Sequence, residues 1–197
     1  ARGEASWASL AAAEQEEMEQ VVAMYTEAAA QGHGRAQYSL GLIYHQGQGV
    51  ARSLDRAIEL YTQAGQQGYA GAYYNLGNLL HSERQDVDGA EKAFRAAIEA
   101  DPGHADAHNN LGLLLQNERD DVDGAEKAFR AAIEADPGYA NAHFNLGVTL
   151  LVYRQNLDGA GKAFRLAIRA DPKKFDGVVN ALQTIIVSFI ADLGPDD

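Results

Sequence analysis

Three asparagines recur at one position of an internal repeat, and their side chains are suited to holding another polypeptide. Asn75, Asn110 and Asn145 stand 35 residues apart, each directly before a Leu-Gly pair. A primary amide offers a donor and an acceptor to one peptide unit and is indifferent to the side chains beside it. The spacing therefore predicts either a site that binds the backbone of an extended peptide or a set of hydrogen bonds that joins neighbouring helices.

The sequence gives weaker support for a metal site or a catalytic site than for the asparagine site. His104 and His108 have the i,i+4 spacing of a metal-binding pair, with Asp101 and Asp106 nearby. The next copy of the repeat carries Tyr139 in place of the first histidine, and no third ligand is fixed. The sequence contains no cysteine, which excludes a thiolate zinc site and a thiol nucleophile. No Ser, His and acid set recurs at catalytic spacing, so we expect no metal, no cofactor and no enzymatic activity.

The charge of the chain narrows the class of partner. Sixteen Lys and Arg residues stand against 28 Asp and Glu residues, which gives a net charge of −12. Nucleic acids and anionic membranes attract clustered cations, so neither is the expected partner. The apolar runs near the C-terminus, such as Ile-Ile-Val at 185–187, are too short to span a membrane. We expect a soluble protein of the cytoplasm or of an organelle.

The asparagines are positioned by paired helices. Apolar residues fall at helical spacing in two runs, about 70–82 and 87–100 in one 35-residue unit, with a polar turn between them. Asp88 and Glu91 have the spacing of a capping box that starts the second helix, and the Asp-Pro pair at 101–102 ends it. The glycine of each Leu-Gly pair lets the two helices approach closely. We expect Phe94 and its counterparts to fill the space between neighbouring units.

These residues resemble two related repeat families. The tetratricopeptide repeat (TPR) pattern is carried by a set of spaced positions, with one residue more than the usual length of about 34: Ala107, Ala142, Leu-Gly, Ala125, Phe129, Ala132 and Asp136-Pro137. Upstream, the stretch AQYSLGLIYHQGQGVARSLDRAIELYTQAGQQG at 36–68 resembles the Sel1-like repeat. The resemblance implies an all-α, right-handed superhelical solenoid whose first helices line a concave groove.

The expected organisation is a single repeat domain over residues 1–197. It divides into an N-terminal helix or half repeat at 1–33, a Sel1-like repeat at 34–68, three TPR-like repeats at 69–172 and a C-terminal capping helix at 173–197. The capping helix is predicted from an apolar stripe at helical spacing: Phe175, Val178, Val179, Leu182, Ile185, Ile186, Phe189, Ile190 and Leu193. Its opposite face carries almost no charge, which favours a further interface there.

The first helices also carry most of the variation between repeats. Residues 86–103 and 121–138 are identical, whereas the first helices that follow them differ. The differences predict ligand contacts in the groove, or else drift at tolerant exposed positions. The expected partner is a protein or peptide, bound at Tyr38, Tyr74, Asn75, Asn78, Asp106, Asn109, Asn110, Asn141, Phe144 and Asn145. Phe144 would anchor an apolar side chain, unless the C-terminal helix covers it.

Two functions fit these observations. The favoured interpretation is a non-catalytic scaffold, adaptor or assembly subunit that binds an extended segment or a helix of another protein. The asparagines also resemble the asparagine ladder of the O-GlcNAc transferase superhelix. That resemblance implies the alternative, a regulatory or substrate-recruiting repeat domain of a larger enzyme such as a glycosyltransferase.

Overall fold

Helices follow one another along the chain and pack as consecutive pairs. The computed structural model describes residues 12–175, and within them it shows helices and turns but no strand. The helices are α2 (Ala12–Ala30), α3 (Gly34–Gln46), α4 (Leu54–Gln66), α5 (Ala70–Arg84), α6 (Val87–Ala100), α7 (Ala105–Glu118), α8 (Val122–Ala135), α9 (Ala140–Val152) and α10 (Leu157–Ala170). The all-α prediction is confirmed.

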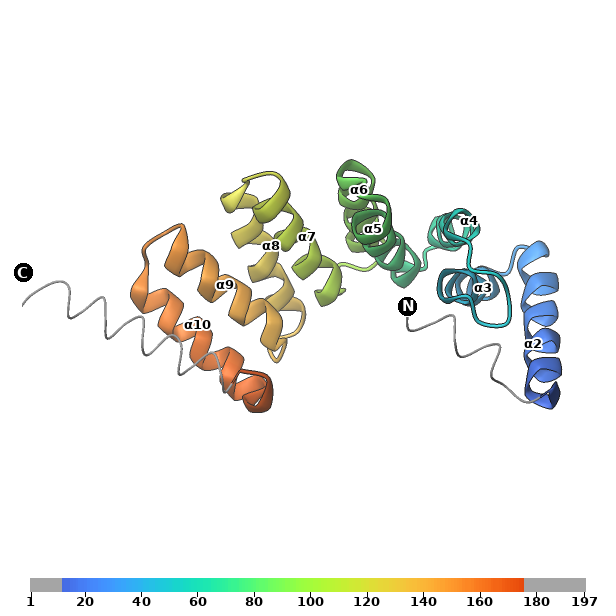
Figure 1. Ribbon diagram of the computed structural model, residues 1–197. Helices are drawn as coiled ribbons and strands as arrows, with labels where there is room; N and C mark the ends of the chain where they lie inside the picture. Colours follow the sequence, from blue (N-terminus) through green and yellow to red (C-terminus); the bar gives the residue numbers. More distant parts are fainter. Residues whose placement is uncertain (1–11, 176–197) are drawn as a thin grey trace, which may run out of the picture.

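The pairs stack into an elongated array. Helices α3 and α4, α5 and α6, α7 and α8, and α9 and α10 make the most extensive contacts, and each pair packs on the next through α4 with α5, α6 with α7, and α8 with α9. Figure 1 shows α2 and α10 at opposite ends of this array. The described part is thus a solenoid of helix pairs, in which α3, α5, α7 and α9 are first helices and α4, α6, α8 and α10 are second helices.

Close helix approach within each pair depends on one glycine and one aromatic ring. A Cβ atom added to Gly112 would lie only 2.6 Å from Cε1 of Phe129, and Gly77 and Gly147 face their own rings at the same distance. Phe129 is fully buried. The predicted close approach is confirmed. The ring fills the space between the two helices of its own pair. The sequence interpretation, which placed it between neighbouring units, is wrong on this point.

The second helices begin two residues earlier than the capping-box prediction. Asp86 is the N-cap of α6, and its Oδ1 accepts a hydrogen bond of 2.9 Å from the backbone N–H of Gly89. Asp88 lies in the first turn and pairs instead with the guanidinium of Arg119 in the next unit. The capping-box prediction is therefore wrong, although an N-cap acid does start the helix. Asn156 caps α10 in the same way.

Ion pairs connect the end of a first helix to the second helix of the preceding unit. The guanidinium of Arg154 binds Asp123, and its Nε lies 3.3 Å from Oε2 of Glu126. Nη2 of Arg130 binds the same carboxylate, 2.8 Å from Oε1 of Glu126. Hydrogen bonds from Arg130 and then Arg154 lower the pKa of Glu126 below its ordinary value. The arrangement of Arg119, Asp88 and Glu91 is the same, one unit earlier.

The two ends of the sequence extend past the described residues. Residues 172–175 are helical after α10, at the place where the capping helix is predicted to begin. Residues 176–197, which carry most of its apolar stripe, lie outside the described residues, as do residues 1–11. The division of the chain at residues 33, 68 and 172 stays a prediction.

Candidate functional site

The three asparagines, here called the asparagine row (Asn75, Asn110 and Asn145), donate hydrogen bonds to the first helix of the preceding unit. Nδ2 of Asn75 lies 3.1 Å from the hydroxyl oxygen of Tyr38, and Nδ2 of Asn145 lies 2.8 Å from Oδ1 of Asn109. These bonds tie α5 to α3 and α9 to α7. The structure therefore contains the hydrogen bonds between neighbouring helices that the structural interpretation of the row requires.

The middle asparagine makes the densest set of contacts. Nδ2 of Asn110 donates to Oδ1 of Asn78 at 2.8 Å and to the hydroxyl of Tyr74 at 3.4 Å. Its own Oδ1 accepts from Nδ2 of Asn109 at 3.2 Å. Seven of the predicted site residues thus form side-chain contacts that run from α3 to α9.

The row nevertheless keeps unused hydrogen-bonding capacity. Within residues 12–175, the Oδ1 atoms of Asn75 and Asn145 accept no hydrogen bond from the protein. Both side chains are partly exposed. A primary amide has two donor hydrogens and an acceptor oxygen, so one N–H can join the helices while the oxygen accepts from a ligand. The structural and ligand-binding interpretations of the row are compatible.

A second line of contacts follows the starts of the first helices. The hydroxyl of Tyr139, at the N-cap of α9, donates to Oδ1 of Asp106 in α7. One unit later, Nζ of Lys174 lies 2.7 Å from Oδ1 of Asn141. Burial, followed by the bond to Asp106, raises the pKa of Tyr139 above its ordinary value, so the phenol remains a neutral donor at physiological pH. Asp106 and Asn141 are both engaged with the following unit.

Several residues that differ between repeats, and that could be ligand contacts or drift from the sequence alone, lie in buried packing contacts. Asn109 is only 4% exposed. Thr149 donates from Oγ1 to Oε1 of Gln116 at 2.7 Å, and both side chains are buried between α7 and α9. Leu114 is also buried. The Gln116–Thr149 pair was not predicted from sequence. Its signal was that each of these polar residues has a leucine at the equivalent position of the other repeat.

Phe144 is covered on one side by the start of the C-terminal segment. Its ring stacks on Phe175 with centroids 5.1 Å apart and is tilted against Phe164 at 5.6 Å. Phe175 is buried at 5% exposure, while Phe144 is partly exposed. Phe175, at the start of the C-terminal segment, therefore covers part of Phe144, as the alternative interpretation expects. A ligand-anchoring function for Phe144 stays a prediction.

The candidate metal histidines make local structural contacts. Nδ1 of His104 accepts a hydrogen bond of 3.3 Å from the N–H of Ala107 and caps α7. Nε2 of His108 lies 3.0 Å from the carbonyl oxygen of Pro102. The part of the chain that the structure describes contains no group of three or more potential metal-ligating side chains. None of its helices is long and apolar enough to cross a membrane.

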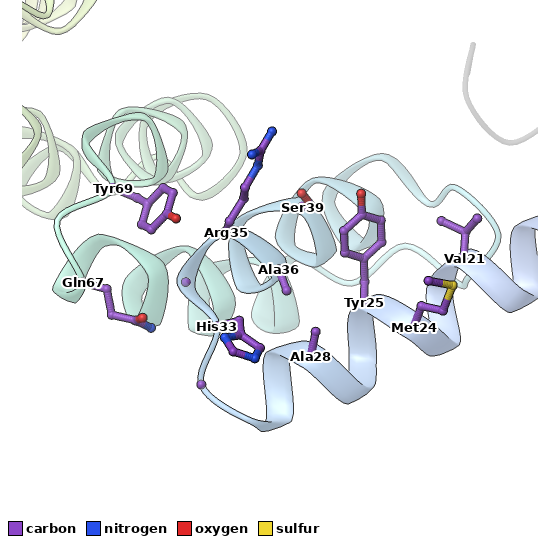
Figure 2. A pocket seen from close by; sticks show the side chains of 12 residues that line it. Val21, Met24, Tyr25, Ala28, His33, Arg35, Ala36, Ser39, Gln67 and Tyr69 are labelled. Atoms are coloured by element: carbon purple, nitrogen blue, oxygen red, sulfur yellow. The ribbon is translucent and has the colours of Figure 1, made fainter.

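A cavity that the sequence analysis did not predict lies at the N-terminal end of the array, and we call it the N-terminal cavity. It has a volume of about 770 Å³ and lies between α2, the start of α3 and the turn before α5. Figure 2 shows Val21, Met24 and Tyr25 projecting from α2 on one side, with Arg35 and Tyr69 on the other. Met24 is 71% exposed. The cavity is thus an open apolar hollow with one cation at its edge.

Comparison with known families matches this repeating geometry. The tetratricopeptide repeat family matches residues 79–121 and 117–174, and the Sel1 repeat family matches residues 34–69. The chain contains tetratricopeptide repeats and a Sel1 repeat. The recognition of both repeat types from sequence is confirmed. No curated protein sequence matches the chain significantly.

Solved structures of other repeat proteins share the fold. MamA superposes with a TM-score of 0.64 at 23% identity, over 83% of this chain and 94% of MamA. The antigen c5321, present in uropathogenic Escherichia coli strains and displaying an SLR fold, gives 0.64 at 27% identity over 75% of this chain, which spans 33% of that antigen. YrrB, a TPR protein with an unusual peptide-binding site, gives 0.58 at 27% identity over 81% of both chains.

The repeat families define a coarse function. TPR proteins act as protein-interaction scaffolds, and TPR and Sel1 repeat proteins are typically non-catalytic. Stacked repeats of this kind present extended surfaces on their first helices. In this TPR and Sel1 repeat protein, that surface carries the asparagine row and its hydrogen-bonding neighbours.

Proposed function

We propose that this protein is a non-catalytic scaffold or adaptor that binds an extended peptide or a helix of a partner protein along α3, α5, α7 and α9. One observation carries the proposal: the amide oxygens of Asn75 and Asn145 are open and partly exposed, while an N–H of each amide fixes its orientation. Orientation by a neighbouring helix reduces the conformational entropy that a side chain loses when a ligand binds.

The spacing of the row suits an extended backbone. Packed helices lie about 8–10 Å apart, and an extended peptide rises about 3.4 Å per residue. Successive asparagines would therefore meet about every third residue of a bound strand. Because amides recognise the backbone, we expect affinity to depend weakly on ligand sequence near Asn75 and Asn145, whose oxygens are open.

The charge of the protein adds a preference. Lys and Arg are outnumbered, and the net charge is −12. A partner segment with a net positive charge would be attracted over several ångströms, and its association rate would fall as salt increases. Proteins with basic extended segments are the favoured class of partner.

The test is a selection of displayed random peptides on the wild-type protein, followed by affinity measurement with the enriched peptides by fluorescence anisotropy. The variant Asn75→Leu should weaken binding by about twofold to tenfold, the range of one neutral hydrogen bond. Lys127→Ala, at an exposed position of second helix α8, is the matched control and should bind as wild type does. Equal affinity of Asn75→Leu and wild type for every enriched peptide would contradict the proposal.

A further inference from the structure

Helix α2 has the side chains of a second helix, but within residues 12–175 no first helix covers the face that would hold one. Its apolar residues stand 36 positions before a set in α4 that is buried against α3. In α4 these residues are Ala57, Leu60, Tyr61 and Ala64, all 8% exposed or less. In α2 their counterparts Val21, Met24 and Tyr25 are 40%, 71% and 36% exposed.

The N-terminal cavity occupies the place of that absent partner. A first helix packs both on the second helix of its own pair and on the first helix that follows it in the array, as α7 does with α8 and α9. The cavity is lined by α2 and by residues of α3, including Arg35 and Ser39. Its shape and its apolar wall therefore fit a first helix lying beside both.

The C-terminal segment has the register of a further first helix. Lys174 follows Tyr139 by 35 residues, and its bond to Asn141 repeats the bond of Tyr139 to Asp106 one unit earlier. The sequence beyond the described residues keeps the same step. Gly177, Asn180, Thr184 and Ile185 follow Ala142, Asn145, Thr149 and Leu150.

We propose that residues 173–193 of one copy of this chain fill the N-terminal cavity of a second copy and complete a helix pair with its α2. In the existing pairs, the position of Gly77 faces the aromatic ring of Phe94, and Leu80 lies against Gly89 of the partner helix. The same positions in the C-terminal segment are Leu182 and Ile185. Leu182 of one copy thus meets Tyr25 of the next, apolar against apolar.

The residues at the proposed contact are larger than those of the existing pairs. Leu182 stands where the other first helices have glycine, so this pair must be more widely spaced than the pairs within the chain. Val21, which stands where α4 and α6 have Ala57 and Ala90, is correspondingly larger. Side chains of this size set helix axes toward the upper end of the usual 8–10 Å. The contact is weaker than an intrachain pair but remains apolar.

The geometry of this contact determines the kind of assembly. The surfaces at its two sides are different, so the contact is heterologous and each added copy leaves a new free end. Growth is open, and the solenoid continues from copy to copy. Each copy carries a net charge of −12, so repulsion opposes assembly and added salt should favour it.

Sedimentation velocity of the full chain tests the proposal over a range of concentrations at 0.05 and 0.5 M salt, levels that bracket the screening range in which surface charge matters. We expect the average mass to pass that of a dimer as concentration increases, and to do so earlier at high salt. Tyr25→Glu, in the cavity, and Leu182→Glu, in the tail, should each remain monomeric. Ala23→Glu, at an exposed position on the other side of α2, is the matched control and should assemble as wild type does.

A mixture of the two defective variants gives the sharpest result. The Tyr25→Glu chain keeps its tail and the Leu182→Glu chain keeps its cavity, so an equimolar mixture should form a dimer and stop there. A wild-type chain that stays monomeric at every concentration, because its own residues 1–11 or nothing at all fill the cavity, overturns the proposal. Assembly that both glutamate variants leave intact also overturns it.

Cysteine cross-linking gives a second readout that does not depend on folding of the glutamate variants. The chain has no cysteine. Tyr25→Cys and Leu182→Cys chains, mixed and oxidised, should form a disulfide-linked dimer, whereas Ala23→Cys with Leu182→Cys should not. Equal cross-linking of the two mixtures would contradict the proposed contact. None of these outcomes bears on peptide binding by the first helices.

Discussion

Nδ2 of Asn145 lies 2.8 Å from Oδ1 of Asn109, and this hydrogen bond joins α9 to α7 at a place where Asn109 is almost completely buried. A buried carbonyl oxygen that loses its donor retains the full cost of leaving water. The bond therefore specifies how one repeat docks on the next, in addition to any function on the outer side of the row.

The first prediction concerns this bond. Asn145→Ala should lower the free energy of unfolding by about 1–3 kcal/mol, because the oxygen of Asn109 is left unsatisfied. A double-mutant cycle with Asn109→Ala, measured by urea denaturation, should give a coupling energy of about 0.5 kcal/mol or more. Additive effects of the two substitutions would show that the row does not stabilise the array and would favour a purely ligand-binding function.

The helical pairs could be predicted from sequence because their determinants are local and periodic. In the last three pairs, the glycine of the first helix and the aromatic residue 17 positions later, as in Gly112 and Phe129, recur at a fixed step. The structure places the two in contact. Each such pair independently reports the same helix packing, so the repeat pattern was sufficient to give the architecture.

The second prediction uses that contact. Gly112→Ala would place a methyl carbon 2.6 Å from the ring of Phe129. Because this ring is buried and cannot move away freely, the substitution should destabilise the protein by about 1–3 kcal/mol. Gly161→Ala is the matched control: it also lies inside a helix, and its new methyl would have its nearest neighbour at 3.6 Å. We expect the control to stabilise by about 0.5–1 kcal/mol through helix propensity.

Thermal or urea unfolding of both glycine variants measures the difference directly. The two substitutions add the same atom in the same secondary structure, so their opposite signs isolate the contact with the aromatic ring. Equal stabilisation by both would mean that the helices of a pair separate at no cost.

Helix starts were less predictable because two acids compete for the same function. The spacing between Asp88 and Glu91 predicts a helix start at Asp88, whereas Asp86 is the N-cap in the structure. In the structure, Gln85 has a left-handed backbone with φ of 54°, which ends α5 and leaves Asp86 at the N-cap. The choice depends on the turn between the helices, and Asp88 is instead drawn into an ion pair with Arg119 of the next unit.

Cross-repeat contacts were the least predictable part of the site. A donor and its acceptor, such as Thr149 and Gln116, lie 33 residues apart, and neither residue alone indicates burial. From sequence, differences between repeats therefore predict ligand contacts or drift at exposed positions, and not burial between helices. The bare face of α2 was also missed, because exposure of Met24 depends on which helix lies beside it and not on the residue itself.

The third prediction concerns acid and salt. Arg130 and Arg154 hold the pKa of Glu126 below its ordinary value, so the unfolded chain binds protons at a higher pH than the folded chain does. The stabilisation from these pairs is fully present above the ordinary glutamate pKa of about 4.3 and is lost as pH falls through the lowered folded value. Urea midpoints should therefore fall more steeply below about pH 4.5 in wild type than in Arg154→Gln.

A matched variant separates the ion pair from general charge effects. Lys127→Gln removes the same charge from an exposed position of α8, next to Glu126. It should leave the steepness of the acid transition as in wild type. High salt should reduce the difference between Arg154→Gln and wild type at pH 7, because exposed pairs are screened. An identical acid transition in wild type and Arg154→Gln would contradict the prediction.

The last prediction decides between two functions of Phe144. Its ring stacks on Phe175, which is buried, and Asn109 occupies the equivalent position of the preceding repeat. If the ring holds the C-terminal segment, Phe144→Asn should destabilise by about 1–3 kcal/mol, since stacked aromatic contact and apolar burial are both lost. The loss of stability should be smaller in a Phe175→Ala background, because the two rings act on each other.

If Phe144 instead anchors a ligand, the substitution should leave the free energy of unfolding unchanged and weaken binding of a selected peptide by about 2 kcal/mol. Urea denaturation and fluorescence anisotropy on the same preparations measure both quantities. A stability loss that is the same with and without Phe175 would contradict the stacking account, and unchanged affinity would contradict the anchor.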